Sequence, residues 1–479
     1  LGSMPSICPH HGKKIKKSIR NVRAVGTVIG LAIAIAAAWL STHSRKASAQ
    51  HYPILPFASV RPVLEALANE LPAELREPNE SKWNAWAKRE DAAIRARLEQ
   101  GARDSMINLL LFGTSFTDQP RAWGILEADN PLLQSRLNDF LRGVRDPRGN
   151  ERLAFVRSVL GRRGLNIDSL GAYEQAKAFV LENLERVARE QRALKQQSDD
   201  AMRESDPKID PSAGSGAFRE RGIALDTKIL FSFGISAALR DMKTRGAVRK
   251  GSISRVAVIG PGLDFADKDY GYDFYPLQTL QPFAIYDSLV QLGLAQAGKI
   301  DIVAFDISPE VLGHLRRLYE RARAGEAYVV QLPRESRPWA PDVIEYWRAF
   351  GSAIGDPVAP IQPPPALKDL ETRAVRIRPQ VVMSCQPVDL NFVLEQLGPP
   401  IKERFDLVIA TNVFVYYDYL EQALALQNIS TVLKPGGFLL ANDLPLAPSE
   451  IPMSPLGYTS VRYGEGESLR DHIFWWLRE

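Results

Sequence analysis

Two glycines and one aspartate stand where two short apolar segments end, and these residue types suit the binding of a nucleotide-like ligand. Gly260 and Gly262 follow the apolar run 256–259. Because glycine lacks a Cβ, a turn built from these residues lets a ligand approach the main chain closely. Asp306 ends a second apolar run, 302–305, and its carboxylate is suited to accept hydrogen bonds from ribose hydroxyl groups. A plain strand-turn connection is the alternative, since a glycine pair alone is a weak signal.

The elements that must position these residues are buried parallel strands. Both apolar runs are short and continuous, as expected for central strands covered by helices on both faces. A third run, 405–412, is followed by a helical stretch, the turn 433–437 and a fourth run, 438–443. Open α/β sheets bind ligands at the carboxyl ends of their strands. The sequence therefore predicts a ligand site at one edge of such a sheet.

Four segments resemble, in this order, the motifs of class I S-adenosylmethionine-dependent methyltransferases: Val258–Gly262, Phe305–Asp306, Phe405–Ile409 and Leu433–Gly437. The resemblance covers roughly residues 225–479. It implies an α/β fold with a Rossmann-like, mostly parallel sheet, and S-adenosylmethionine as the cofactor. The β-type runs 458–463 and 472–477 predict a hairpin, and a terminal antiparallel hairpin is what this family has.

The resemblance also implies which residues contact the cofactor. The expected set is Gly260, Pro261, Gly262, Asp306, Ile307, Gln386, Asp389 and Asn412. Residues 381–385 resemble the third strand, so Gln386 stands near the place of the acid that commonly meets the adenine amino group, and Asp389 comes late. Tyr416 and Tyr417 follow the fourth strand and are candidates for the substrate cleft or, equally, packing residues. This stretch is locally similar to chemotaxis-receptor methyltransferases.

Two insertions interrupt the motifs. The first, 263–276, holds five aromatic residues and four acids. Because it must emerge at the carboxyl end of the first strand, we expect Tyr270, Tyr272 and Tyr275 to line the substrate cleft; a surface loop anchored by its aromatic residues is the alternative. The second insertion, about 328–370, contains two tryptophans and a Pro-rich piece. It either shapes the substrate side or caps the sheet edge.

The amino-terminal half predicts a separate α-helical domain, residues 52–195. Apolar residues recur at helical spacing in five segments: 83–98, 106–113, 130–144, 151–160 and 172–194. Residues 196–216 are rich in Ser, Asp, Pro and Gly and form the predicted linker. Residues 217–479 are then expected to fold on their own as the methyltransferase-like domain. Asp226 is a candidate N-cap for a helix through Ile229 and Leu239.

Residues 1–49 predict a signal peptide or an N-terminal membrane anchor. A basic region precedes the charge-free run Ala24–Leu40, and Ala47–Ala49 fits a small-residue cleavage site. We therefore expect an exported, periplasmic or membrane-anchored protein, with a cytoplasmic location as the alternative. This segment holds eight of the 60 Lys and Arg residues and no acid, so 52 basic residues stand against 56 acidic ones in the remainder. A nucleic-acid partner thus loses its simplest electrostatic support.

The remaining composition favours a cofactor enzyme without a metal. The two cysteines are far apart, and the histidines outside the leader are isolated from one another, so we expect no metal site. The expected reaction is methyl transfer to a small molecule or a protein side chain, in which alignment of the reactants suffices and no general base is obligatory. Two alternatives stay open: a catalytically degenerate binding module, favoured by the exported location, and a nicotinamide-dependent oxidoreductase, although Gly260 and Gly262 lack the third glycine of that motif.

Overall fold

The structure is a computed structural model that describes most of the chain beyond the predicted leader. The described residues are 52–122, 129–203, 222–266, 273–334, 339–364, 367, 370–396, 403–443, 445, 447–464 and 470–479. The leader 1–49, Tyr270, Tyr272 and residues 204–216 of the predicted linker lie outside them. No helix within these described ranges is both long enough and apolar enough to cross a membrane.

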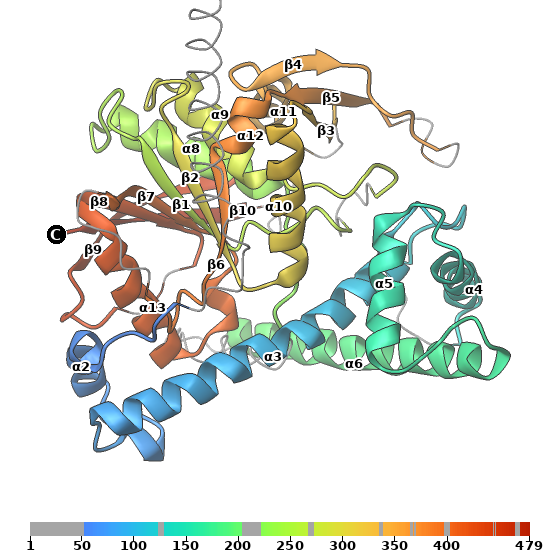
Figure 1. Cartoon of the computed structure of the whole chain (residues 1–479), viewed down its shortest axis with the longest axis horizontal. Coiled ribbons are helices and arrows are strands. Elements are labelled where there is room, and N and C mark those ends of the chain that lie inside the picture. Colours follow the sequence, from blue (N-terminus) through green and yellow to red (C-terminus); the bar gives the residue numbers. More distant parts are fainter. Residues whose placement is uncertain are drawn as a thin grey trace, which may run out of the picture. The chain divides into compact units, whose positions relative to one another are not determined.

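A seven-stranded sheet forms the centre of the described carboxyl-terminal half (Figure 1). Its strand order is β6-β2-β1-β7-β8-β10-β9. Neighbouring strands from β6 to β8 are parallel, whereas β10 runs antiparallel to both β8 and β9. The strands are β1 Arg255–Ile259, β2 Asp301–Asp306, β6 Cys385–Asp389, β7 Phe405–Ala410, β8 Leu433–Ala441, β9 Met453–Arg462 and β10 Arg470–Arg478. The predicted mostly parallel sheet with a terminal antiparallel hairpin is confirmed.

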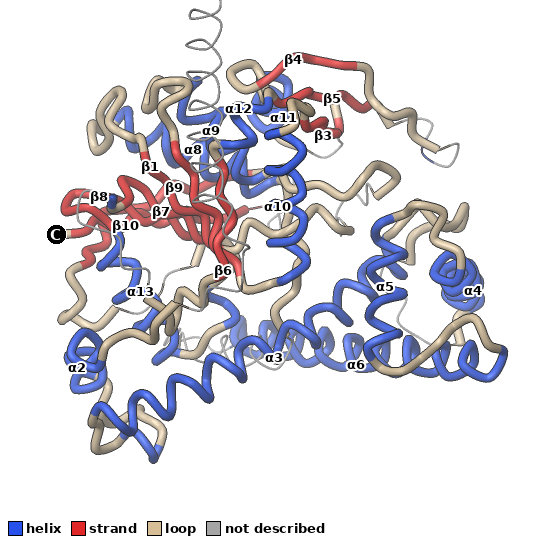
Figure 2. Tube along the Cα trace, viewed as in Figure 1, coloured by secondary structure: helices blue, strands red, loops and turns tan. Residues whose placement is uncertain are grey.

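Helices cover both faces of this sheet, which explains why its central strands β1, β2 and β7 are buried without alternation. In β1, Val256 and Val258 belong to one hydrophobic cluster, while Ala257 and Ile259 belong to another. Figure 2 shows the helices on both sides of the strands. Those whose apolar residues join the first cluster are α8 Leu230–Thr244, α9 Gln281–Gln291 and α10 Pro309–Arg323; those of the second are α2 Phe57–Ala66 and α13 Tyr419–Val432.

The amino-terminal half is helical, as predicted. Its longer helices are α3 Glu80–Phe112, α4 Pro131–Arg145, α5 Glu151–Arg162 and α6 Leu170–Arg203, and the turn η1 Ala73–Leu75 precedes them. Asparagines begin three of these helices, because a side-chain oxygen at the N-cap accepts from an otherwise unpaired N–H group. They are Asn79, Asn130 and Asn150. The two helical segments predicted within 83–113 form one continuous helix of 33 residues.

Helix α3 belongs to both halves of the molecule. Trp83 and Ile94 in its first part lie in the cluster on the α13 face of the sheet. Met106 and Leu110 in its second part lie in the cluster shared with α4, α5 and α6. Residues His51–Glu479 accordingly form one compact unit. The domain boundary at 196–216 stays a prediction, with α6 extending to Arg203.

The second insertion builds a small antiparallel sheet of order β3-β5-β4. Its elements are β3 Tyr328–Pro333, α11 Pro341–Ala349, β4 Gly355–Val358 and β5 Thr372–Ile377. Asp287 of α9 accepts hydrogen bonds from the backbone N–H groups of Gly351 and Ala353 at 2.8 and 2.9 Å. Trp347 is fully buried in the cluster that contains α8 and α9. The insertion is therefore anchored to the helices on one face of the main sheet.

The third parallel strand lies four residues later than predicted. Residues Pro379–Met383 form the short helix α12, and β6 is Cys385–Asp389. Pro379 occupies the first turn of α12, where its fixed φ suits helix initiation. This local signal outweighs the β-branched pair Val381 and Val382, which suggested a strand. As a result Asp389, expected late in the following loop, ends the strand itself.

Candidate functional site

A cleft opens at the carboxyl ends of the parallel strands and contains ≈ 700 Å³ of space, part of it open to solvent. Its floor comes from the turn after β1, the end of β2 and the segment after β7. Its opposite wall comes from Leu98 of α3 and from residues 223–227. Figure 1 shows α3 running past the ends of the strands. We call Leu98 and residues 223–227 the roof of the cleft.

The glycine turn after β1 forms one end of the floor. Gly260 and Gly262 both have left-handed backbones, with φ of 63° and 62°, a conformation that favours glycine. A Cβ on Gly262 would stand 2.8 Å from the Cβ of Thr227. The roof pairs with this turn, since the N–H of Leu263 donates to the Leu225 carbonyl at 2.8 Å. Pro261 is buried in the turn and does not line the cleft.

Asp306 ends β2 and lines the cleft beside Ile307. Its Oδ1 accepts a hydrogen bond from the Ser308 backbone N–H at 2.7 Å. The N-cap of α10 is Ser308, which accepts from Val311 N–H, so Asp306 is not the capping residue. Burial raises the pKa of the Asp306 carboxyl to about 7 despite these backbone donors. A ligand that donates to this carboxylate would favour its charged form.

Asp389 ends β6, directly opposite Asp306 in the strand register. Leu390 and Phe392, which follow it, line the cleft and give it an apolar wall. Asp389 itself is not among the residues that line the cleft but directly precedes Leu390, and Arg95 of α3 donates from Nη1 to its Oδ1 at 2.9 Å. Gln386 lies near the start of β6, is exposed, and is not among the lining residues.

Asn412 follows β7 and lines the cleft with a left-handed backbone, φ 54°. Its side chain is fixed by Asn442: the Asn412 N–H donates to Asn442 Oδ1 at 2.7 Å, and Asn442 Nδ2 donates to Asn412 Oδ1 at 2.8 Å. Thr411 beside it accepts from Gln281 Nε2 at 2.6 Å. The Thr411 hydroxyl therefore has its proton available for another acceptor.

The tyrosine candidates divide between two places. Tyr416 and Tyr417 line the cleft, and burial raises the pKa of the Tyr417 hydroxyl above its usual value, so that it stays protonated. Tyr275 lines a different cavity together with Thr114 and Asp273, and its hydroxyl donates to Asp264 at 2.8 Å. Tyr270 and Tyr272 lie outside the described residues.

The roof is the part of the site that the sequence did not reveal. Asp226, expected to cap the helix through Ile229, instead accepts from Ser105 and Asn108 of α3 at 3.0 and 2.9 Å. Helix α8 begins without a side-chain cap. The apolar stripe of α3 that includes Leu98 indicates only core packing, because helical periodicity marks a buried face without showing what that face contacts.

A second aspartate with a raised pKa lies under the loop that carries the two cleft tyrosines. Asp443 accepts hydrogen bonds from the backbone N–H groups of Phe414 and Val415, which belong to the short helix η4 Phe414–Tyr416. Burial, and then the charge of Asp471, raises the pKa of the Asp443 carboxyl to about 7. Asp443 thus fixes the backbone of η4, which carries the cleft residue Tyr416.

The site therefore offers a cleft with apolar walls, a carboxyl group and glycine backbone at the ends of the parallel strands. Asp306 provides a charged acceptor at the middle, Leu390 and Phe392 provide apolar surface on one side, and the Gly260 turn provides main-chain approach on the other. Such a set suits a ligand with a hydroxylated sugar between an aromatic ring and a polar tail.

Comparison with known proteins agrees with this geometry in the carboxyl-terminal half. Residues 369–441 match a family model described as a methyltransferase domain. Solved structures similar to this chain include the N-methyltransferase NodS from Bradyrhizobium japonicum WM9, with 12% sequence identity, 50% of this chain and 94% of that chain covered, and a TM-score of 0.25.

A second is the magnesium protoporphyrin IX methyltransferase ChlM from Synechocystis PCC 6803 with bound SAM, with 11% identity, 59% and 91% covered, and a TM-score of 0.26. A TehB-like SAM-dependent methyltransferase from Corynebacterium glutamicum ATCC 13032 has 9% identity, 61% and 99% covered, and a TM-score of 0.20. No curated protein matches the chain. The methyltransferase-domain match over residues 369–441 and the strand order identify the fold of the carboxyl-terminal half.

Proposed function

We propose that this protein transfers the methyl group of S-adenosylmethionine to a nucleophilic substrate. The premise is that its carboxyl-terminal half carries a class I S-adenosylmethionine-dependent methyltransferase domain. The single observation that carries the proposal is the cleft between the Gly260 turn and Asp306. Because Gly262 lacks a Cβ, the roof residue Thr227 packs directly on the glycine turn and narrows the cleft beside it. Asp306 lies partly exposed at the end of β2 and lines the same cleft. These residues fit an adenosine-containing ligand.

Each part of the cofactor has a candidate partner in the cleft. Asp306 would accept hydrogen bonds from the two ribose hydroxyls, because a carboxylate is a strong acceptor. Ile307, Leu390 and Phe392 would enclose the adenine ring, with Asp389 at the end of the neighbouring strand to accept from its amino group. The glycine turn would face the methionine end.

The methionine end would also meet Thr411. Gln281 donates to the Thr411 oxygen at 2.6 Å, so the threonine proton is directed to a different acceptor. A ligand carboxylate is such an acceptor. Both side chains are buried, with 3% and 5% of their surfaces exposed, which holds the donor in one orientation.

Catalysis by these residues would consist of alignment and exclusion of water. When bound, S-adenosylmethionine supplies an electrophilic methyl group on a positively charged sulfur. Asn412, fixed by Asn442, and Tyr416 lie on the side of the cleft after β7, where they would orient the nucleophile. Holding two reactants in line is sufficient to lower the barrier substantially, so no general base is assigned.

The substrate is proposed to be a small molecule or a protein side chain, and the protein to act outside the cytoplasm or at a membrane. The location rests on the basic and charge-free segments within residues 1–49. The net negative charge of the remaining residues argues against nucleic acid as the substrate.

Isothermal titration calorimetry of the purified protein with S-adenosylmethionine, S-adenosylhomocysteine and NAD tests the proposal. We expect both sulfur cofactors to bind and NAD not to bind. Binding of NAD alone would support the oxidoreductase instead. Absence of binding by all three would support a degenerate module. A second assay offers the protein S-adenosylmethionine with a panel of thiols, amines, carboxylates and phenols as acceptors. Binding without formation of S-adenosylhomocysteine in this assay would indicate a fold that keeps the ligand but not the reaction.

A further inference from the structure

We propose that Arg95 of helix α3 is a positioning residue for adenine recognition, holding Asp389 in the orientation in which its second oxygen accepts from the 6-amino group. This inference rests on the proposed function and deepens it. It makes the amino-terminal helical half part of the cofactor site.

The guanidinium of Arg95 lies among three carboxylates. Nη1 donates to Asp389 Oδ1 at 2.9 Å, Nη2 donates to Glu395 Oε2 at 3.0 Å, and Nε lies 3.2 Å from Asp91 Oδ1. Arg95 is 20% exposed, and Glu395 only 2%. A planar fork that contacts separate partners from all three nitrogens has little rotational freedom left, so the position of the Asp389 carboxylate is fixed from the α3 side.

The loop after β6 is fixed by the same network. The Asn391 N–H donates to Glu395 Oε2 at 2.6 Å, and Asn391 Nδ2 donates to Asp91 Oδ1 at 2.8 Å. Asn391 stands between Leu390 and Phe392, the two apolar residues that line the cleft. Arg95 and its partners therefore hold both the acid and the apolar wall on the expected adenine side.

Charge explains why this position needs an arginine. Asp91, Asp389 and Glu395 surround one cation, and their mutual repulsion would drive them apart without it. Lysine would keep the positive charge but offers no fixed fork, so it would hold Asp389 less firmly. Within the described residues, Arg95 bonds Asp389 through Oδ1 and no hydrogen bond to Oδ2 is present. Asp389 keeps 24% of its side chain exposed and directly precedes Leu390, which lines the cleft, so the proposal assigns its Oδ2 to the ligand.

The location of Arg95 relative to the cleft supports a role in binding. It lies one helical turn before Leu98, which lines the cleft. Between them, Arg97 donates to the Tyr416 carbonyl, and its own carbonyl accepts from the Ile223 N–H at 3.2 Å. One turn of α3 thus contacts Asp389 on the expected adenine side, Ile223 of the roof and Tyr416 in the segment after β7.

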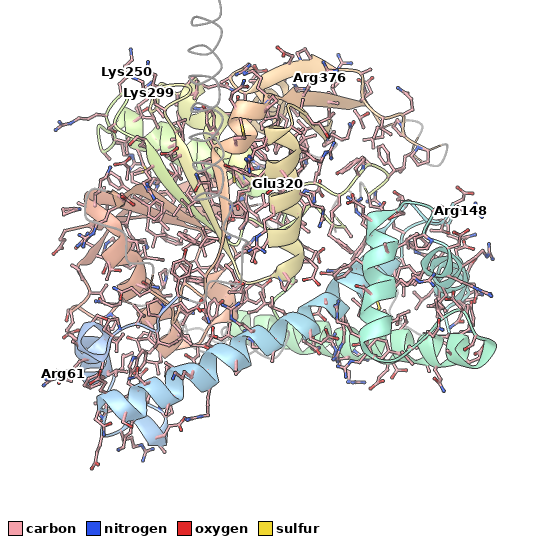
Figure 3. The ribbon with its side chains drawn as sticks, in the orientation of Figure 1. Arg61, Arg148, Lys250, Lys299, Glu320 and Arg376 are labelled. Carbon is pink, nitrogen blue, oxygen red and sulfur yellow. The ribbon has the colours of Figure 1, made fainter. Side chains whose placement is uncertain are left out.

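The test compares S-adenosylhomocysteine with S-inosylhomocysteine, in which a carbonyl oxygen replaces the 6-amino group. Calorimetric affinities for both ligands are measured on the parent protein, Arg95→Met, Arg95→Lys, Asp389→Asn and the control Arg61→Met. Arg61 is 64% exposed in its pair with Glu65 on α2 and points outward in Figure 3. The ratio of the two affinities isolates the amino-group contact.

We expect the parent to prefer the adenine ligand by about 10- to 100-fold, as for one hydrogen bond to a charged group. Arg95→Met and Asp389→Asn should each bring this ratio to within about threefold of unity, Arg95→Lys should be intermediate, and Arg61→Met should match the parent. Equal losses for both ligands in Arg95→Met would mean a purely structural role and overturn the inference. If Arg95→Met does not fold, Arg95→Lys and Asp389→Asn decide by the same ratio.

Failure of the inference and failure of the proposed function give different results. A parent protein that binds neither ligand contradicts the proposed function. A parent that binds both equally well keeps the proposed function and removes Asp389, and with it Arg95, from adenine recognition.

Discussion

Asp306 and Asp389 lie opposite each other at the carboxyl ends of the adjacent parallel strands β2 and β6. Burial first, and the charge of Asp389 to a smaller extent, raises the pKa of Asp306 to about 7. Arg95 offsets the charge of Asp389 from α3. Two acids at neighbouring strand ends can therefore serve one ligand, with one acid at its sugar and the other at its base.

Asp306→Asn should weaken binding of S-adenosylhomocysteine by roughly tenfold to a few hundredfold, because one to two hydrogen bonds to a charged acceptor become weaker or are lost. The melting temperature should change little, since Ser308 and not Asp306 caps α10. Calorimetry and thermal unfolding on the same variant measure both quantities. A lower melting temperature with unchanged affinity would place Asp306 in a structural role only.

Binding of S-adenosylhomocysteine should release a proton near pH 6.5. The pKa of Asp306 is raised to about 7 in the free protein, so part of the population is protonated there, and ribose donors favour the carboxylate. Affinity should therefore rise as the pH increases through 7. Calorimetry in buffers with different ionisation enthalpies measures the number of protons released on binding. Asp306→Asn should abolish this release. Asp443, whose pKa is also about 7, is unchanged in that variant, so any release that persists would come from a group other than Asp306.

The same raised pKa has the opposite effect on folding without a ligand. The folded protein binds the Asp306 proton more tightly than the unfolded chain does between about pH 4 and 7. The contribution of this group to the free energy of unfolding is present at the acidic end of that window and is lost as the pH rises through 7.

Gly101→Ala should destabilise the protein by about 1 to 3 kcal/mol and weaken cofactor binding, because overpacking forces the backbone apart. A Cβ at this position of α3 would lie 1.8 Å from the Ile223 carbonyl oxygen, and Ile223 is part of the roof. Gly161→Ala on α5 is the matched control, with no atom within 4 Å of its Cβ. Urea unfolding should show Gly161→Ala to be neutral or stabilising by about 0.5 to 1 kcal/mol. Equal behaviour of the two variants would disprove close packing of the roof on α3.

Limited proteolysis should cut the chain first within residues 196–216, the predicted linker. The two fragments should nevertheless elute together in gel filtration, because Arg152 of α5 donates to the carbonyls of Asp264 and Tyr275 at 2.8 and 2.6 Å. The halves also share a hydrophobic cluster. Preferential cutting between residues 256 and 443 would contradict the boundary, and separate elution would contradict the strength of the contact.

Residues 1–60 fused to a reporter that is active only after export should give a positive signal. The basic residues before Ala24–Leu40 and the small residues at 47–49 motivate this expectation. A fusion without residues 1–49 is the control. A soluble cytoplasmic product from the longer fusion would remove the proposed location.

Strands β1, β2 and β7 were predictable because each is an apolar run followed by a recognisable residue or turn. Asp306 was placed correctly at the end of β2 for this reason. Asp389 was misplaced because the apolar residues Val381 and Val382 imitate a strand, whereas Pro379 starts a helical turn. Local sequence carries both signals, and only packing of the whole chain decides between them.

The roof was not predictable for a different reason. Leu98 and Arg95 stand on a regular amphipathic helix, and nothing in its periodicity shows that the helix passes the strand ends. The partners of Arg95 are distant in sequence: Asp389 and Glu395 lie about 300 positions away. Contacts of this range follow from the tertiary fold and leave no short motif.

Strand β10 lies in the sheet between β8 and β9, both of which are translated before it. Until residues 470–478 emerge from the ribosome, the edge of β8 that later pairs with β10 has no partner strand. Trp475 and Trp476, with 2% and 3% of their surfaces exposed in the finished fold, are missing from the interior at that stage. Unpaired strand edges can pair with strands of other chains and so promote aggregation. The interval before residues 470–478 emerge is therefore a stage at which the growing sheet is open to such association.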